Sequence, residues 1–237
     1  MIRSIIENRL IPETDYIYGF AELTGLLDKK YTEFPSGLSI GQRLDDTILD
    51  EIDTGNGPTP AYYELYNETN RNLMELASRL QNDLEILGVK SVIIEPTIPP
   101  ERSNSVEYLR TLTADVSHKM VATRAGLGWI GKTDLFVSKR FGPRLRLVSL
   151  LMDHPLKPAH IPITKSRCGT CTLCVDRCPA GAANGKLWDI RVRREEFFDA
   201  HKCRETCGKL ARTRLNVDRR VCGICVSVCP IGKKVKK

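Results

Sequence analysis

The cysteines carry the clearest chemistry of this chain, because all nine fall within its last 70 residues. Four of them, in the stretch CGTCTLCVDRCP from Cys168 to Pro179, follow the spacing C-x2-C-x2-C-x3-C-P. Two-residue gaps let a tight loop wrap three thiolates around three irons of one cubane, and the spacing is typical of [4Fe–4S] sites. The fourth cysteine is expected to begin a helix that points away and to bind a neighbouring cluster.

A shorter cysteine phrase, CGICVSVCP from Cys222 to Pro230, returns with the spacing C-x2-C-x3-C-P. It lacks one thiol of the usual set, and only Cys203 and Cys207 remain to supply it. Exchange of the last cysteine between the two phrases therefore predicts two clusters. The predicted ligands are Cys168, Cys171, Cys174 and Cys229 for the first cluster, and Cys178, Cys222, Cys225 and one of Cys203 or Cys207 for the second.

Zinc is the main alternative, since CxxC pairs also form four-thiolate zinc sites. A zinc site usually takes its ligands from two well-separated CxxC arms, and it leaves the third closely spaced thiol and the repeated Cys-Pro unexplained. Disulfides are disfavoured in a cytoplasmic protein, where thiols stay reduced. Two neighbouring cubanes instead provide a path for electron transfer.

The remainder of the chain is long enough for a fold that positions these clusters. Its 237 residues, 41% hydrophobic and 27% charged, indicate a globular protein with one or two domains. The sequence has no apolar run long enough for a transmembrane helix and no secretory signal at its start, so we expect a cytoplasmic protein. The proline-rich stretch at 154–167 predicts a boundary between an α/β domain, 1–160, and a cluster domain, 161–237.

Hydrophobic periodicity predicts α/β structure in the first domain. Leucines at three- and four-residue steps indicate a helix over 61–88, which Gly88 ends. A shorter helix is expected at 117–125. Strands are expected at DYIYGFAEL and SGLSIGQRL, each followed by a helix, and then at VKSVIIEPT, TDLFVS and LRLVSLLM, the last two joined by a turn at KRFGPR.

The segment AGLGWIGK, Ala125 to Lys132, contains the glycine spacing of a dinucleotide fingerprint. It follows a predicted helix and precedes a predicted strand, which is the reverse of the context that the fingerprint requires, so a Rossmann site is excluded. The glycines indicate either a tight connection or close approach of the backbone to a large ligand. Trp129 and Lys132 add a stacking surface and a cation, which favours the ligand.

Taken with the two cysteine phrases in the same order, the segment HKMVATRAGLGWIGKTDLFVS resembles the epoxyqueuosine reductase family. The resemblance implies an iron–sulfur and cobalamin enzyme, related to reductive dehalogenases, that performs the last step of queuosine synthesis on tRNA. It also implies a nitroreductase-like, cobalamin-binding α/β domain joined to a bacterial-ferredoxin-like domain with two [4Fe–4S] clusters. The corrin would then lie near Gly126, Gly128, Trp129, Gly131 and Lys132.

The same resemblance bears on two further residues. The segment DAHKC is similar to the one that precedes a lone cluster cysteine in the family, which favours Cys203 over Cys207. The family has an acidic proton donor just before its glycine loop, and the acid in this stretch is Asp115. A carboxylic acid suits that role when burial raises its pKa toward neutrality. His118 as the donor, a different reaction, and a helix-capping role for Asp115 stay open.

Positive charge gathers at the end of the chain, where residues 201–237 carry eleven Lys and Arg against two Asp and Glu. The lysines of KKVKK, 233–237, are suited to tRNA phosphates, and a basic surface also suits an acidic electron donor such as a ferredoxin or flavodoxin. A solvated tail is the plainer alternative. Two other functions stay open: a ferredoxin-like electron-transfer protein, and a reductase with flavin or no cofactor in its first domain.

Overall fold

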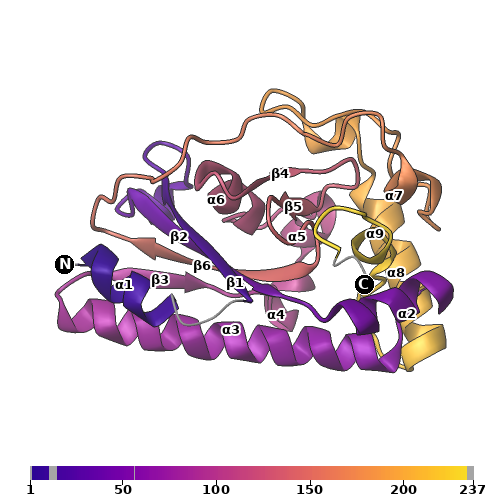
Figure 1. The fold of residues 1–237 in the computed structure, drawn as a ribbon, viewed down its shortest axis with the longest axis horizontal. Helices are drawn as coiled ribbons and strands as arrows, with labels where there is room; N and C mark the ends of the chain where they lie inside the picture. The colour runs from indigo at the N-terminus through magenta and orange to yellow at the C-terminus, as the bar shows by residue number, and fades with distance from the viewer. Residues whose placement is uncertain (1, 11–14, 56, 234–237) are drawn as a thin grey trace. The chain divides into compact units, whose positions relative to one another are not determined.

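The structure, a computed structural model, describes residues 2–10, 15–55 and 57–233 (Figure 1). Apart from Lys233, the lysine-rich end named above lies outside the described residues. The chain forms two compact units, and each combines segments that are far apart in the sequence. The first unit comprises Met1–Arg43, Thr69–Leu127 and Arg146–Ile163, and the second Leu44–Glu68, Gly128–Leu145 and Thr164–Lys237. All nine cysteines belong to the second unit, while the domain division between residues 160 and 161 stays a prediction.

A four-stranded sheet organises the first unit. Its strands follow the order β1 (Tyr16–Glu22), β2 (Ser36–Arg43), β6 (Leu145–Met152) and β3 (Ser91–Ile94). β1 pairs antiparallel with β2, and β3 pairs antiparallel with β6. The strands predicted in these places are confirmed, but the helix predicted after the first strand is wrong. Only a 3-10 turn, η1 (Lys29–Tyr31), separates β1 from β2, because an antiparallel partner needs no helical crossover.

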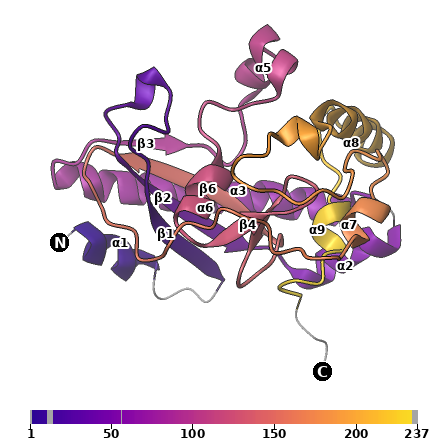
Figure 2. The same cartoon turned by 90° about the horizontal axis from the view of Figure 1, so that it is seen from above.

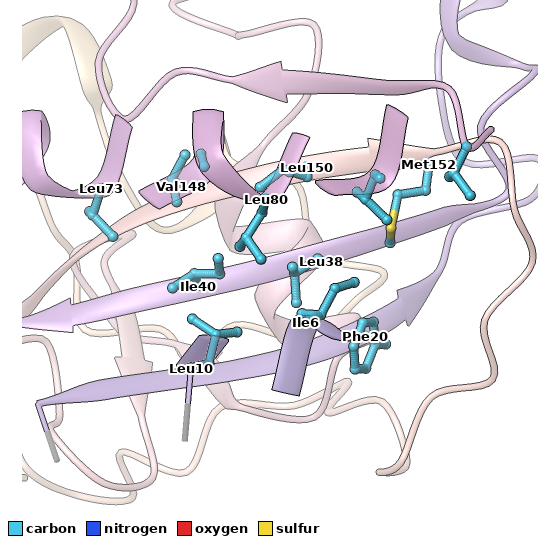
Figure 3. Close-up of a cluster of buried hydrophobic side chains, with 13 residues drawn as sticks. Ile6, Leu10, Phe20, Leu38, Ile40, Leu73, Leu80, Val148, Leu150 and Met152 are labelled. Carbon is cyan, nitrogen blue, oxygen red and sulfur yellow. The ribbon is translucent and has the colours of Figure 1, made fainter. Parts of the chain in front are cut away.

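One face of this sheet is covered by α1 (Ile2–Leu10) and by α3 (Pro60–Ile86). Figure 3 shows the side chains of both helices pointing toward those of β1, β2 and β6. The leucine spacing used to predict the long helix accounts for this contact, since Leu73, Leu80 and Leu84 are fully buried. The buried cluster also contains Ile6, Leu10, Phe20, Leu38, Ile40, Ala77, Val89, Val148, Leu150 and Met152.

The opposite face of the sheet is covered by α6 (His118–Arg124), which confirms the helix predicted there. Val121 packs with Leu151, whose neighbours Leu150 and Met152 face the other side of β6. Alternate residues of a strand point to opposite faces, so this sheet is buried on both sides. Two short helices, α4 (Pro100–Ser103) and α5 (Val106–Thr111), lie between β3 and α6 in the chain.

His118 fixes α6 to the sheet through both nitrogens of its ring. Its Nε2 lies 2.8 Å from the carbonyl oxygen of Glu95, and its Nδ1 lies 2.9 Å from Oγ of Ser149 on β6. A carbonyl only accepts hydrogen bonds, so Nε2 carries the proton and Nδ1 accepts from the serine hydroxyl. Burial lowers the pKa of His118 to about 4, so the ring is neutral at pH 7.

This arrangement predicts a loss of stability in acid. As pH falls from 6.5 to about 4, His118 takes up a proton in the unfolded chain but not in the folded one. The free energy of unfolding should therefore drop by about 2–3 kcal/mol across this window. Urea denaturation at a series of pH values, with His118→Gln as the reference, isolates this contribution. Equal pH dependence in both proteins would contradict it.

The second unit is built from short elements around a small apolar core. Its elements are α2 (Asp46–Gly55), the hairpin β4 (Gly128–Ile130) and β5 (Phe136–Ser138), α7 (Leu173–Asp176), η2 (Arg194–Glu196), α8 (Ala200–Leu215) and α9 (Ile224–Ser227). Figure 2 shows α9 beside α2 and α7. Its core contains Leu44, Leu49, Ile52, Tyr62, Val221 and Ile224. Within the described residues, no helix is both long and apolar enough to cross a membrane.

Candidate functional site

The first cysteine phrase forms a loop around α7. The amide of Cys171 donates to the carbonyl of Cys168 over 3.3 Å, and Cys174 lies within the helix. The prediction that Cys178 begins a helix is wrong, because α7 already ends at Asp176. The amide of Cys178 instead donates to the carbonyl of Val175 over 3.2 Å, in the turn that closes this helix.

The cysteines of the two phrases mix in space. Cys229, from the second phrase, lies within electrostatic reach of Cys168, Cys171 and Cys174. Cys225 lies within electrostatic reach of Cys178 and Cys222, and also of Cys174 from the first phrase. This pattern is what an exchange of the last cysteines requires, although the individual ligand assignments stay predictions.

Cys203 and Cys207 both lie on α8, one turn apart. Asp199 caps this helix by accepting a hydrogen bond from the amide of Lys202 over 3.0 Å. The two cysteine sulfurs are 3.8 Å apart, and the Cys207 thiol also hydrogen-bonds Cys222. Cys207 is therefore in contact with two other thiols, a position that the sequence spacing did not reveal.

Burial determines the protonation of several thiols before iron binds. It raises the pKa of Cys174 and Cys225, and it raises the pKa of Cys229 to about 11. The hydrogen bond with Cys207 lowers the pKa of Cys222 to about 7. Since iron binds thiolates, cluster assembly must release protons from the buried thiols.

The β4–β5 hairpin lies against the first cysteine phrase. The indole Nε1 of Trp129 donates to Sγ of Cys168 over 3.4 Å, and Nζ of Lys132 donates to the carbonyl of Cys171 over 3.0 Å. Thr133, which the sequence analysis did not single out, hydrogen-bonds the thiols of Cys174 and Cys225. Three residues of the hairpin, Trp129, Lys132 and Thr133, thus contact cysteine side chains or the cysteine backbone.

The glycines of this segment are required by packing within each unit. Gly126 has φ +70°, and a Cβ at this position would lie 2.6 Å from Cβ of His160. A Cβ at Gly128 would lie 2.1 Å from the backbone oxygen of Val137 on the paired strand. Trp129 and Lys132 are only 6% and 4% exposed. The space that a large ligand was expected to fill at Gly126 and Gly128 is filled by the chain itself.

The predicted proton donor, Asp115, is held by two cations. Its Oδ2 accepts hydrogen bonds from Nζ of Lys30 at 2.5 Å and from Nη2 of Arg102 at 2.7 Å. The side chain of Asp115 is 34% exposed. The neutral, doubly hydrogen-bonded imidazole of His118 is engaged in the fold, which leaves Asp115 as the better candidate of the two.

A buried arginine that the sequence analysis missed supports α9. Arg144 is completely buried, and its guanidinium donates to Asp46 of α2 over 3.0 Å and to the carbonyl of Ser227 over 2.6 Å. Ser227 lies two residues from both Cys225 and Cys229. The only signal in the sequence was the position of Arg144 in the turn predicted at KRFGPR, directly before an apolar strand.

Replacement of Arg144 should weaken the cysteine phrase on α9. Arg144→Met removes the fully buried cation that pairs with the partly buried Asp46 carboxylate, and breaking a buried ion pair costs about 3–5 kcal/mol. We expect lower thermal stability and a loss of iron and sulfide per chain after anaerobic reconstitution. Lys139→Met, which removes an exposed cation from the same turn, is the matched control. Full iron content in Arg144→Met would show that the arginine does not support the cluster.

The second unit contains a recognisable cluster domain. Residues 167–232, which include all nine cysteines, match the family model described as a 4Fe-4S double cluster binding domain. Two [4Fe–4S] clusters are therefore the cofactors of this segment. Within the described residues, no three His, Cys, Asp or Glu side chains are arranged to hold a single metal ion. The thiol set fits cubanes, in which each thiolate binds its own iron.

Curated proteins with similar sequences carry the name epoxyqueuosine reductase. The one from Cyclobacterium marinum is 32% identical over 126 residues, 50% of this chain and 37% of that protein. The one from Xanthomonas campestris pv. campestris is 31% identical over 150 residues, 62% of this chain and 37% of that protein. The chain thus spans little more than a third of the length of these relatives.

Solved structures show the same similarity in fold. A crystal structure of epoxyqueuosine reductase with an epoxyqueuosine-modified tRNA-Tyr stem loop has a TM-score of 0.60 at 19% identity, covering 98% of this chain and 65% of that one. A catabolic reductive dehalogenase in complex with 3-bromo-4-hydroxybenzoic acid has a TM-score of 0.64 at 14% identity, covering 92% and 30%. The predicted resemblance and the α/β fold class are confirmed.

Proposed function

We propose that this chain acts as an iron–sulfur reductase similar to epoxyqueuosine reductase. Electrons would pass one at a time through two [4Fe–4S] clusters toward a corrinoid at which the substrate is reduced. The observation that carries this proposal is the contact between α7 and α9, the helices of the two cysteine phrases, within the matched double-cluster segment. Sequence and fold similarity to epoxyqueuosine reductases supplies the reaction class.

The proposed ligands of the first cluster are Cys168, Cys171, Cys174 and Cys229, and those of the second are Cys178, Cys203, Cys222 and Cys225. Cys203 is chosen over Cys207 because of the sulfur contacts. Ligands bonded to different corners of a cubane point away from one another, whereas Cys207 is in hydrogen-bond contact with both Cys203 and Cys222. Cys207 is then a thiol outside the ligand set, whose single S–H can donate to the sulfur of Cys203 or of Cys222.

Electrons are proposed to enter through the first cluster. Of the nine cysteines, only Cys171 is exposed, so this ligand gives an external donor the shortest approach to iron. The flanking segment from Lys165 to Arg177 carries exposed cations, which suits an acidic donor such as a ferredoxin or flavodoxin. Reduced iron–sulfur thiolates are compatible with the cytoplasm, where we place the protein.

Cobalamin is proposed as the further cofactor from similarity to proteins of this fold, one of which is described as performing B12-dependent dehalogenation. When bound, it would supply the bond-breaking chemistry. The five residues predicted to contact cobalamin do not form a binding surface for it by themselves. Gly126 and Gly128 face the chain's own atoms, a Cβ at Gly131 would lie 3.1 Å from the Val137 side chain, and Trp129 and Lys132 are buried against cysteines. Their contact with a corrin stays a prediction.

Asp115 stays the proposed proton donor, although its side chain, 34% exposed, lacks the burial that favours this role. Lys30 and Arg102 hold its carboxylate in place in the loop before α6, and the partly exposed side chain can be reprotonated from solvent. Removal of an epoxide oxygen as water consumes two electrons and two protons, so a single carboxylic acid must be reloaded during each turnover. Solvent contact at Asp115 satisfies this need.

A modified nucleoside in tRNA is the proposed substrate. An epoxyqueuosine reductase of the same fold has been solved with a modified tRNA stem loop. In this chain, exposed cations on α8 and directly after it provide charge for phosphate contacts. They are Lys202, Lys209, Arg212, Arg214, Arg219 and Arg220.

Exchange of ligands between the phrases has a direct test. Cys178→Ser should remove the second cluster and leave the first, although Cys178 belongs to the first phrase. Cys203→Ser should have the same effect, because it removes another ligand of the second cluster. Iron and sulfide content with EPR of the reduced protein measures which cluster remains.

Two control variants complete this test. Cys171→Ser should damage the first cluster instead, and Cys207→Ser should retain both, since we assign no iron to Cys207. Loss of the second cluster in Cys207→Ser with retention in Cys203→Ser would reverse the assignment of the eighth ligand.

The function as a whole is tested with anaerobically reconstituted protein. We expect tight cobalamin uptake in the visible spectrum, and loss of one oxygen from an epoxyqueuosine-bearing tRNA by mass spectrometry. Asp115→Asn should abolish this turnover while changing the free energy of unfolding by only about 0–1 kcal/mol, as expected for exposed ion pairs. Iron–sulfur absorption without cobalamin uptake or turnover would identify an electron-transfer protein instead.

A further inference from the structure

We infer that the β4–β5 hairpin sets the reduction potential of the first cluster through Trp129 and Lys132. This inference rests on the proposed ligands Cys168 and Cys171 of that cluster. It gives the two residues an electronic role at iron, in place of the contact with a large ligand that the sequence predicted. Both belong to the second unit, as do the cysteines that they contact.

Trp129 supplies a hydrogen bond to a ligand sulfur. Its Nε1 lies 3.4 Å from Sγ of Cys168, and the side chain is 6% exposed. An indole nitrogen only donates hydrogen bonds, so Trp129 is the donor whether the sulfur of Cys168 is a thiol, a thiolate or bound to iron. The backbone of the hairpin also comes close to the same atom, because a Cβ added at Gly131 would lie 3.7 Å from Sγ of Cys168. The indole is therefore held against the thiol by the hairpin.

Lys132 supplies positive charge beside the same loop. Its Nζ donates to the carbonyl of Cys171 over 3.0 Å, and the residue is only 4% exposed. Lysine is seldom fully buried, since its charge loses hydration there. A nearby anion offsets that loss, and a cubane with four thiolate ligands is an anion. A cluster bound by Cys168 and Cys171 would account for the buried ammonium of Lys132.

Both contacts act on the potential in the same direction. Reduction adds an electron to a cluster that is already negative. A hydrogen bond to a thiolate and a nearby cation both stabilise the more negative state, so both raise the potential. At the second cluster the corresponding donor is the Cys207 thiol, which is a weaker hydrogen-bond donor than an indole N–H. Trp129 and Lys132 therefore act on the first cluster alone, whereas Thr133 of the same hairpin contacts a ligand of each cluster.

The experiment is an EPR-monitored redox titration of the anaerobically purified full chain. In Trp129→Phe and in Lys132→Gln, one of the two cluster potentials should fall, and it should be the same one in both variants. The other potential should not move. Lys132→Arg, which keeps the charge, should restore a potential near that of the unmodified protein.

A matched variant separates the hydrogen bond from the shape of the ring. The chain has two tryptophans, so Trp188→Phe leaves Trp129 as the single tryptophan. Trp188→Phe alone should leave both potentials unchanged. Biosynthetic replacement of Trp129 by 3-benzothienylalanine in this background keeps the bicyclic shape and removes the N–H. It should lower the same potential as Trp129→Phe, even if the phenylalanine variant assembles its clusters poorly.

Two results would overturn the inference. Unchanged potentials in the benzothienylalanine protein and in Lys132→Gln, with full iron content, would show that the hairpin only packs against the loop. An equal fall of both cluster potentials would show that the substitutions disturb the second unit as a whole and not the first cluster in particular. Absence of iron from the unmodified protein would instead refute the proposed function itself.

Discussion

The main constraint on the second unit is the burial of many thiolates in a small space. Eight ligand sulfurs and the iron that they hold form two anionic groups, and removing charge from water is unfavourable unless donors or cations replace the lost hydration. The chain meets this constraint with donors directed at sulfur or at the cysteine backbone. Trp129, Lys132 and Thr133 come from the β4–β5 hairpin, and Cys207 comes from α8.

Support for the two cysteine phrases differs in kind. The first phrase is braced by the hairpin, through hydrogen bonds to Cys168 and Cys171. The second is braced by the buried Arg144, which joins the acidic start of α2 to the carbonyl of Ser227. Hairpin and arginine belong to one continuous segment, Gly128–Leu145, so a single insertion between α6 and β6 supports the cysteines of both phrases.

Local signals in the sequence predicted most of what depends on near neighbours. The spacing of the cysteines, the leucine period of α3 and the strands β1, β2, β3 and β6 are of this kind. The role of Arg144 was not predictable, since its partners Asp46 and Ser227 lie 98 and 83 residues away. The helix expected after β1 failed because strand patterns do not reveal antiparallel pairing. Helix α7 ends before Cys178 because only the fold determines where so short a helix stops.

The glycine segment shows how a shared motif can have a physical cause other than the expected one. AGLGWIGK carries the resemblance to epoxyqueuosine reductases, and a ligand loop was the natural interpretation. In the structure, Gly128 lets the hairpin strands approach closely, and Trp129 and Lys132 reach the cysteine loop. Each of these features serves an iron–sulfur centre whether or not a corrin is bound. The segment is therefore stronger evidence that the protein holds two clusters in this arrangement than that it reduces any particular substrate.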